Sequence, residues 1–135
     1  MACRNTELLR ATLAHIEANP EQWWQGDHRG PGRRGEILDF AARAVVLAGG
    51  VWAFGPVQHG PDRALNFLIE ESGDSAGDVE LVRGVRVVDV RARAKRVLGL
   101  DEETARDLFH EGIENVEELR ELVDALCASA SEEVM

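Results

Sequence analysis

The four histidines are the side chains best suited to bind a metal, and they are spread over the whole chain of 135 residues. A physiological metal site needs three or four His, Cys, Asp or Glu ligands at restrained spacing. The sequence contains no HxH or HxxxH pair, and its strongest candidate pair is Asp27 with His28. Two neighbouring residues alone favour a polar turn, so no metal and no other cofactor is expected.

Nucleophilic and phosphate-binding motifs are not indicated by the sequence. Cys3 and Cys127 lie near opposite ends without CxxC spacing, which favours free thiols in a reducing cytoplasm. No GxSxG motif is present. The stretches GPGRRG and AGGVWAFG match neither a Walker motif nor the strand, GxGxxG and helix order of a dinucleotide site. They are interpreted as a flexible loop and the end of a helix.

A carboxylate next to the most apolar segment is the best candidate for acid–base chemistry, because a carboxylate near a core must be paired, hydrogen-bonded or perturbed. Asp39 is such a residue, although Arg43 follows it at helical i,i+4 spacing and favours a simple ion pair. The rival hypothesis to a non-catalytic protein is therefore a small enzyme or ligand-binding protein. Its pocket would lie between the central helix and the flanking loops and would use His28, Asp39, His59 and His110.

Three tryptophans, Trp23, Trp24 and Trp52, could form an aromatic surface for a ligand or a nucleic-acid base. Two of them, Trp23 and Trp24, are adjacent, and adjacent side chains point in different directions in regular structure. One is expected to fill the junction after the first helix, while the other is partly exposed and available for binding.

The net charge of −10 comes from the C-terminal third of the chain, because residues 101–135 contain two Arg and twelve acidic residues. Such a surface repels phosphate and favours a basic protein partner over nucleic acid. Its central positions are Glu117, Glu118 and Glu121. Just before it, the arginines and the lysine of 91–96, Arg93 included, form a basic cluster. This cluster could bind an anionic ligand, or it could equally be a solvated helix face neutralised by the acidic helices that follow.

The hydrophobic pattern predicts a mainly α single domain, a bundle of about five helices packed around a central apolar helix. Asn5, Asp101 and Asn115 can cap helices, while Gly99 can end one. Residues 26–35 are expected to form a loop, and residues 129–135 a frayed tail. Helices are expected over 6–18, 36–48, 61–71, 90–98, 102–110 and 116–128, with an extended stretch at 79–90 that allows a small β-hairpin.

Export and membrane insertion are not indicated. The first residues, MACRNTELLRATLAHIE, have no continuous apolar stretch and no cleavage pattern of small residues. The longest apolar run, 41–55, has fifteen residues including Arg43, whereas a membrane helix needs about twenty apolar residues. The run is interpreted as core, no membrane association is expected, and the expected location is cytoplasmic. The sequence gives no indication of oligomeric state.

Three blocks of the sequence resemble an uncharacterised family of small, mostly helical proteins from high-GC actinobacteria and their phages. They read HIEANPEQWWQG, AVVLAGG, and RAKRVLGLDEETARDLFHEGIENVEELRELVDAL, and together they cover about two fifths of the chain. The family has no assigned activity, so the resemblance implies a helical fold and a lineage only. One departure is that Asp39, Ala42 and Arg43 stand where the family usually has Cys, Gly and Trp.

These observations predict a non-catalytic interaction or regulatory module that binds a basic protein through Glu117, Glu118 and Glu121, with Trp23 or Trp24 as an apolar anchor. Besides the small enzyme or ligand-binding protein, the acidity and the resemblance to phage proteins leave a third hypothesis open. This is an acidic inhibitor that mimics DNA.

Overall fold

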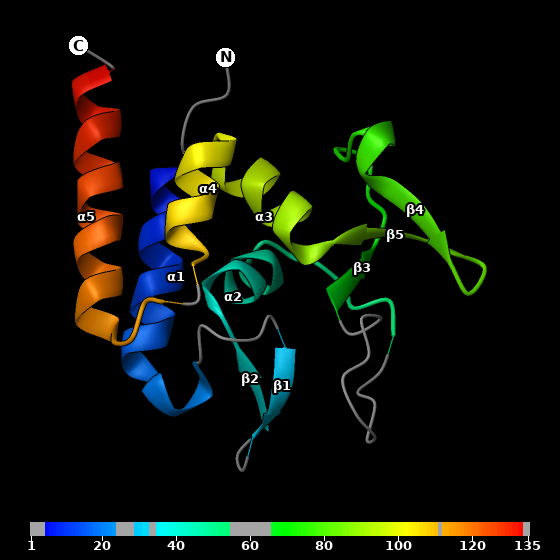
Figure 1. Cartoon of the computed structure of the whole chain (residues 1–135), viewed down its shortest axis with the longest axis horizontal. Coiled ribbons are helices and arrows are strands. Elements are labelled where there is room, and N and C mark those ends of the chain that lie inside the picture. The colour runs from blue at the N-terminus through cyan, green and yellow to red at the C-terminus, as the bar shows by residue number, and fades with distance from the viewer. Residues whose placement is uncertain (1–4, 24–28, 33–34, 55–65, 111, 134–135) are drawn as a thin grey trace.

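The structure is a computed structural model that describes residues 5–23, 29–32, 35–54, 66–110 and 112–133. These residues form a mainly helical fold with two small antiparallel sheets (Figure 1). The predicted mainly helical fold with about five helices is confirmed, but the structure contains more sheet than the single small hairpin that the sequence allowed. The helices are α1 (Thr6–Ala18), α2 (Phe40–Leu47), α3 (Val90–Leu98), α4 (Glu102–Leu108) and α5 (Val116–Glu133); the strands are β1 (Arg29–Gly32), β2 (Gly35–Leu38), β3 (Phe67–Ile69), β4 (Val79–Val82) and β5 (Val85–Asp89).

The first and last helices lie side by side and antiparallel (Figure 1). α1 begins as predicted, because the Asn5 side chain accepts a hydrogen bond from the Leu8 amide at 3.0 Å. Apolar side chains of both helices are fully buried between them and the rest of the core, as their helical spacing predicts. These are Leu9, Leu13 and Ile16 of α1 and Leu119, Val123 and Cys127 of α5.

The central helix is shorter than the predicted range of 36–48. Gly35–Leu38 is strand β2, and α2 begins at Phe40 because the Asp39 carboxylate accepts a hydrogen bond from the Ala42 amide at 2.8 Å. Asp39 is thus the N-cap, in extended backbone geometry, and not an interior helical residue. The following residues are the most buried part of the fold, with no solvent exposure at Phe40, Ala41, Ala42, Ala44 and Val45.

Part of the predicted loop 26–35 is regular structure. β1 and β2 pair antiparallel, from Arg29 opposite Leu38 to Gly32 opposite Gly35. The glycines and the proline of this stretch suggested irregular backbone. In a two-stranded ribbon, however, only alternate backbone groups of each strand pair with the other strand. A proline is therefore tolerated at a position whose N–H would not be paired. The prediction failed because the hydrogen bonds come from the partner strand, which composition does not show.

The predicted hairpin at 79–90 is confirmed, and it belongs to a three-stranded sheet of order β3-β5-β4. Arg83 and Gly84 join β4 to β5 with φ of 51° and 81°, the two positive φ angles of a tight hairpin turn. β3 replaces the end of the helix predicted over 61–71, because Leu68 pairs with Val88 of β5 and also bridges to Trp52. Residues 61–65 of that predicted helix lie outside the described residues.

The end of α3 and the starts of α4 and α5 agree with the sequence pattern. α3 ends at Gly99, which has a left-handed φ of 68°, and Asp101 caps α4 through the Thr104 amide at 2.7 Å. Asn115 accepts from the Glu118 amide at 2.9 Å, while the Glu118 carboxylate accepts in return from the Glu114 amide. The α5 backbone stays helical to Glu133, within the segment that was expected to fray.

The sheet and the helices are joined without a connecting loop. Asp89 is the last residue of β5 and also the N-cap of α3, where its carboxylate accepts a hydrogen bond from the Arg91 amide at 2.9 Å. α3 packs in turn against α2, so the sheet lies directly beside the helical core (Figure 1). No helix in the described residues combines the length and apolar character that crossing a bilayer requires.

Candidate functional site

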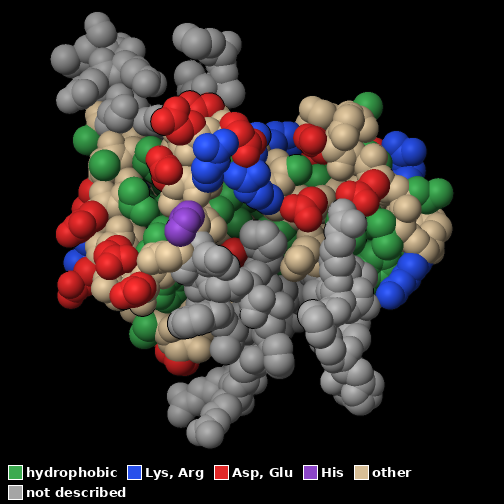
Figure 2. Space-filling model, viewed as in Figure 1, with side chains coloured by type: hydrophobic (Ala, Val, Ile, Leu, Met, Phe, Trp, Pro, Cys, Tyr) green, Lys and Arg blue, Asp and Glu red, His purple; other side chains and the backbone are tan. Residues whose placement is uncertain are grey.

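The acidic surface predicted for the C-terminal third lies on the exposed sides of α4 and α5. In Figure 2 acidic side chains gather over the left and upper parts of the molecule, where Figure 1 shows α5 and α4. α5 buries Leu119 and Val123, and its acids occupy the opposite side of the helix. We call the following exposed residues the acidic face: Glu103, Asp107, Glu117, Glu118 and Glu121.

Carboxylates at the edge of this surface are neutralised by arginines of the neighbouring helix. Arg10 of α1 contacts Asp124 of α5 at 2.9 Å, and Arg120 of α5 pairs with Glu17 of α1. The side chains in both pairs are about a third to a half exposed or more, so each pair contributes only about 0–1 kcal/mol to stability. Arg120 is the one basic residue in the sequence of α5, and it is paired at the α1 edge.

Most of the acidic face has no such partner. Within the described ranges, Glu103, Asp107, Glu117 and Glu121 form no ion pair. Glu118 differs, because its carboxylate caps the start of α5 by accepting from the Glu114 amide at 3.0 Å. The predicted residues Glu117, Glu118 and Glu121 are thus brought together on one exposed helix side, with one of the three also serving the helix end.

Trp23, predicted as an exposed anchor or a core plug, is half-buried and packs against the core. Its backbone forms an isolated bridge with Leu38. Trp52 is also half-buried against the core and lines a cavity of about 240 Å³ beside α2, together with Arg43. Trp24 lies outside the described residues.

The residues of the predicted enzyme pocket are divided between described and undescribed segments. Asp39 is almost fully buried and caps α2. His110 is exposed, and its Nδ1 accepts a hydrogen bond from the Gly112 amide at 2.8 Å. Both side chains therefore satisfy nearby backbone groups. His28 and His59 lie outside the described residues, and in the described part of the chain no three His, Cys, Asp or Glu side chains form a group that could hold a metal.

His15 is the histidine that contacts the core edge, as its position in the first helix predicts. Burial and the nearby Arg43 charge lower its pKa below the ordinary value of 6.5, which favours the neutral ring. Its Nδ1 is buried without a hydrogen-bond partner in the described structure. The ring lines a shallow groove of about 500 Å³ between α1 and the end of α2, where Leu47 is 41% exposed.

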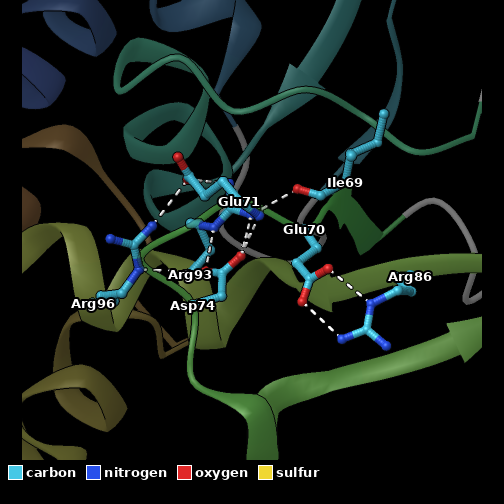
Figure 3. A network of polar contacts seen from close by, with 7 residues as sticks. All are labelled: Ile69, Glu70, Glu71, Asp74, Arg86, Arg93 and Arg96. Atoms are coloured by element: carbon cyan, nitrogen blue, oxygen red, sulfur yellow. Dashed lines mark hydrogen bonds and ion pairs between the residues drawn. The ribbon is translucent and has the colours of Figure 1, made fainter.

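Figure 3 shows a polar network with a buried arginine, Arg93, at its centre. Arg93 of α3 is 1% exposed and binds both oxygens of Asp74, with distances of 2.9 Å from Nε and 2.7 Å from Nη2. Its Nη2 also donates to the Ile69 carbonyl at 2.8 Å, and its Nη1 lies 2.5 Å from Glu71 Oε1. One guanidinium therefore attaches the loop after β3 to α3.

Arg96 completes this network from the next turn of α3. It contacts Glu71 Oε1 at 3.0 Å and Asp74 Oδ1 at 3.3 Å. The backbone passes so close that a β-carbon at Gly73 would lie 2.2 Å from the Arg96 guanidinium. We call Glu71, Asp74, Arg93 and Arg96 the arginine network.

Asp74 stays ionised in the arginine network although its side chain is only 2% exposed. Burial opposes its charge, but hydrogen bonds from Arg93 and from the Glu71 amide outweigh that effect, and they lower the pKa of Asp74 below its ordinary value of 3.8. The network therefore stabilises the fold more when this carboxylate is charged than when it is protonated.

The prediction that Arg93 belongs to a solvated helix face is wrong. Val90, Ala94 and Leu98 form the buried side of α3, and Arg93 lies three residues after Val90, at the edge of that stripe. Helical spacing therefore contained a signal for burial. The partner Asp74 is distant in sequence, in a segment that reads as a turn, and no local pattern joins the two residues.

A surface cleft of about 480 Å³ lies on another side of α3. Two of its residues, Arg91 and Lys95, are one helical turn apart, and each contacts a different oxygen of Glu102, at 2.8 and 2.6 Å. Hydrogen bonds from Lys95 and Arg91 lower the pKa of Glu102. The cleft is lined by Asp78, Asp89, Arg91, Ala92, Lys95, Arg96, Gly99, Leu100 and Glu102.

Comparison of the chain with protein-family models, with curated proteins and with solved structures finds no match. Function therefore has to be inferred from the chain's own geometry, which offers an exposed set of unpaired carboxylates, a buried arginine network and a charged cleft.

Proposed function

We propose that the protein is a non-catalytic interaction or regulatory module of the cytoplasm that binds a basic protein through its acidic face. The observation that supports this proposal is that Glu103, Asp107, Glu117 and Glu121 are exposed and form no ion pair in the described residues. Carboxylates at the α1 edge are paired instead. The lineage suggested by the resemblance to small actinobacterial and phage proteins is part of the proposal, and it adds no activity.

Charge of one sign on a rigid helix attracts a partner of opposite sign and speeds encounter more than it adds affinity. The acidic side chains of α5 project from a helix that is packed along its whole buried stripe by Leu119, Val123 and Cys127. Binding therefore needs no rearrangement of the core. Its strength should fall steeply with salt, because exposed charges are screened over about 8 Å at physiological ionic strength.

The first experiment uses a peptide of eight lysines as a defined basic probe of the full chain, followed by amide chemical shifts. The shifts should concentrate on residues 103–107 and 117–121, and binding should weaken as salt rises. The variant Glu117→Gln/Glu121→Gln should bind about five- to thirtyfold more weakly, since each of the two exposed charge contacts that it removes contributes about 0.5–1 kcal/mol.

The matched control is Glu7→Gln/Glu80→Gln, which removes the same charge from exposed positions on α1 and β4. It should bind the peptide within about twofold of the wild type, because these sites lie away from the acidic face. An equal loss in both double variants would mean that overall charge, and not this face, attracts the peptide, and the proposal would be abandoned.

The native partner can be sought with the same pair of variants. Basic proteins that the wild type and the control retain from a cell extract, and that the Glu117→Gln/Glu121→Gln variant loses, are then purified and tested for direct, salt-sensitive binding. A purified candidate that binds all three forms equally contradicts the assignment of the acidic face as its docking surface.

A further inference from the structure

The cleft beside α3 contains two cations that share one carboxylate. Arg91 Nη1 contacts Glu102 Oε1 at 2.8 Å, and Lys95 Nζ contacts Glu102 Oε2 at 2.6 Å. Both cations extend from one side of α3, because they are four residues apart. The two cations together bind both oxygens of one anionic group. Arg91 and Lys95 carry two positive charges, and Glu102 neutralises one of them.

Glu102 is attached weakly enough to be exchanged. It is the first residue of α4, its side chain is 50% exposed, and those of Arg91 and Lys95 are 37% and 30% exposed. Exposed ion pairs of this kind contribute little stability, and a displaced Glu102 side chain can turn into water. The pair of cations can therefore change partners without unfolding α4.

Acidic side chains also line the cleft, and they limit what can bind. Asp78 is exposed, while Asp89 is half-buried and accepts a hydrogen bond from the Arg91 amide. A simple anion would be repelled by these two carboxylates. A molecule with an anionic end and amino or hydroxyl donors would satisfy both groups of side chains.

We propose that this cleft binds a small molecule whose phosphate or carboxylate group displaces Glu102 from Arg91 and Lys95, and whose amino or hydroxyl groups hydrogen-bond Asp78 and Asp89. Glu102 then acts as a tethered competitor that occupies the cation pair when the ligand is absent. A competitor held on the same chain acts at a millimolar effective concentration, so its removal raises the apparent affinity for the ligand.

Phosphoethanolamine is a suitable probe, because it carries a phosphate and an ammonium group on a short chain. Titration of the full chain should shift the amides of Arg91, Ala92, Gly99 and Leu100 in a saturable manner. The variant Glu102→Gln should bind the probe at least about fivefold more tightly, since it removes the competitor. Ethyl phosphate, which lacks the ammonium group, should bind more weakly than phosphoethanolamine.

Glu114→Gln is the matched control, because it removes the same charge from an exposed residue that belongs to neither the cleft nor the acidic face. It should bind phosphoethanolamine within about twofold of the wild type, since Glu114 does not line the cleft. Lys95→Met in the Glu102→Gln background should lose the gained affinity. Thermal unfolding of each variant verifies that it folds.

Equal affinities of Glu102→Gln and Glu114→Gln, or shifts scattered over other basic residues, would overturn the proposal. This outcome is separate from the lysine-peptide experiment, because the cleft and the acidic face have different charges and are probed by different molecules. Failure at one site leaves the result at the other unchanged.

Discussion

The arginine network and the acidic face use charge in opposite ways. In the network, Arg93 and Asp74 are almost completely removed from water, and each satisfies the hydrogen-bonding groups of the other. On the acidic face, Glu117 and Glu121 remain in water without an ion pair in the described residues. Burial makes the first set necessary for the fold, whereas exposure leaves the second set free for a partner.

The largest effect is expected when the network loses its central cation. Arg93→Met keeps much of the side-chain volume but leaves Asp74 buried without its main partner, so it should reduce the free energy of unfolding by about 3–5 kcal/mol. Urea unfolding of the purified variant measures the change. A loss below about 1 kcal/mol would show that the network behaves like an exposed ion pair and would remove the contrast with the acidic face.

Acid should weaken the network through Asp74. Because the folded state lowers the pKa of Asp74, its stabilising contribution is fully present above the ordinary value of 3.8 and is lost as pH falls through the lower folded value. Asp74→Asn cannot titrate, so it should be less stable at neutral pH by about 1–3 kcal/mol and should lose less further stability below pH 4.

The matched control for this experiment is Glu117→Gln, which removes an exposed carboxylate. Its free energy of unfolding at neutral pH should stay within about 0.5 kcal/mol of the wild type, because the Glu117 side chain is exposed. The role assigned to Asp74 would be contradicted if Asp74→Asn and the wild type lost the same stability between neutral pH and about pH 3.

A buried carboxylate that caps a helix should have an intermediate effect. Asp39→Ala removes the acceptor of the Ala42 amide at the start of α2 and should cost about 1–2 kcal/mol of unfolding free energy. Asp39→Asn retains a side-chain oxygen and should recover part of that loss. Calorimetric melting distinguishes the two, and an Asn variant as unstable as the Ala variant would show that the charge matters more than the cap.

The smallest effect on stability is expected on the acidic face itself. Glu117→Gln/Glu121→Gln should change the free energy of unfolding by no more than about 0.5 kcal/mol, because both side chains are exposed and unpaired in the described residues. The same variant should show the largest loss of lysine-peptide binding. A strongly destabilised double variant would mean that these residues serve the fold after all.

The elements that could be predicted from the sequence are those determined by local signals. Helix α1 with its Asn5 cap, the Gly99 end of α3 and the start of α5 at Asn115 depend on residues close together in the chain, and all were predicted. Strands β1, β2 and β3 were missed, because their hydrogen bonds come from distant or glycine-rich partners. Propensity and periodicity contain no information about such partners.

The candidate site divides in the same way. The exposed row of Glu117, Glu118 and Glu121 followed from helical spacing and charge alone. The partnership of Arg93 with Asp74 did not, because it joins a helix to a turn across nineteen positions. The Arg91–Lys95–Glu102 arrangement was also hidden, since it depends on the angle at which α4 leaves α3 after Gly99.

The position of Asp89 between β5 and α3 restricts how these two elements can move relative to each other. Because Asp89 is both the last residue of β5 and the N-cap of α3, no peptide unit between β5 and α3 can serve as a hinge. Amide protons of β5 and α3 should therefore exchange with solvent at closely matched rates under native conditions, as one cooperative unit that opens and closes together.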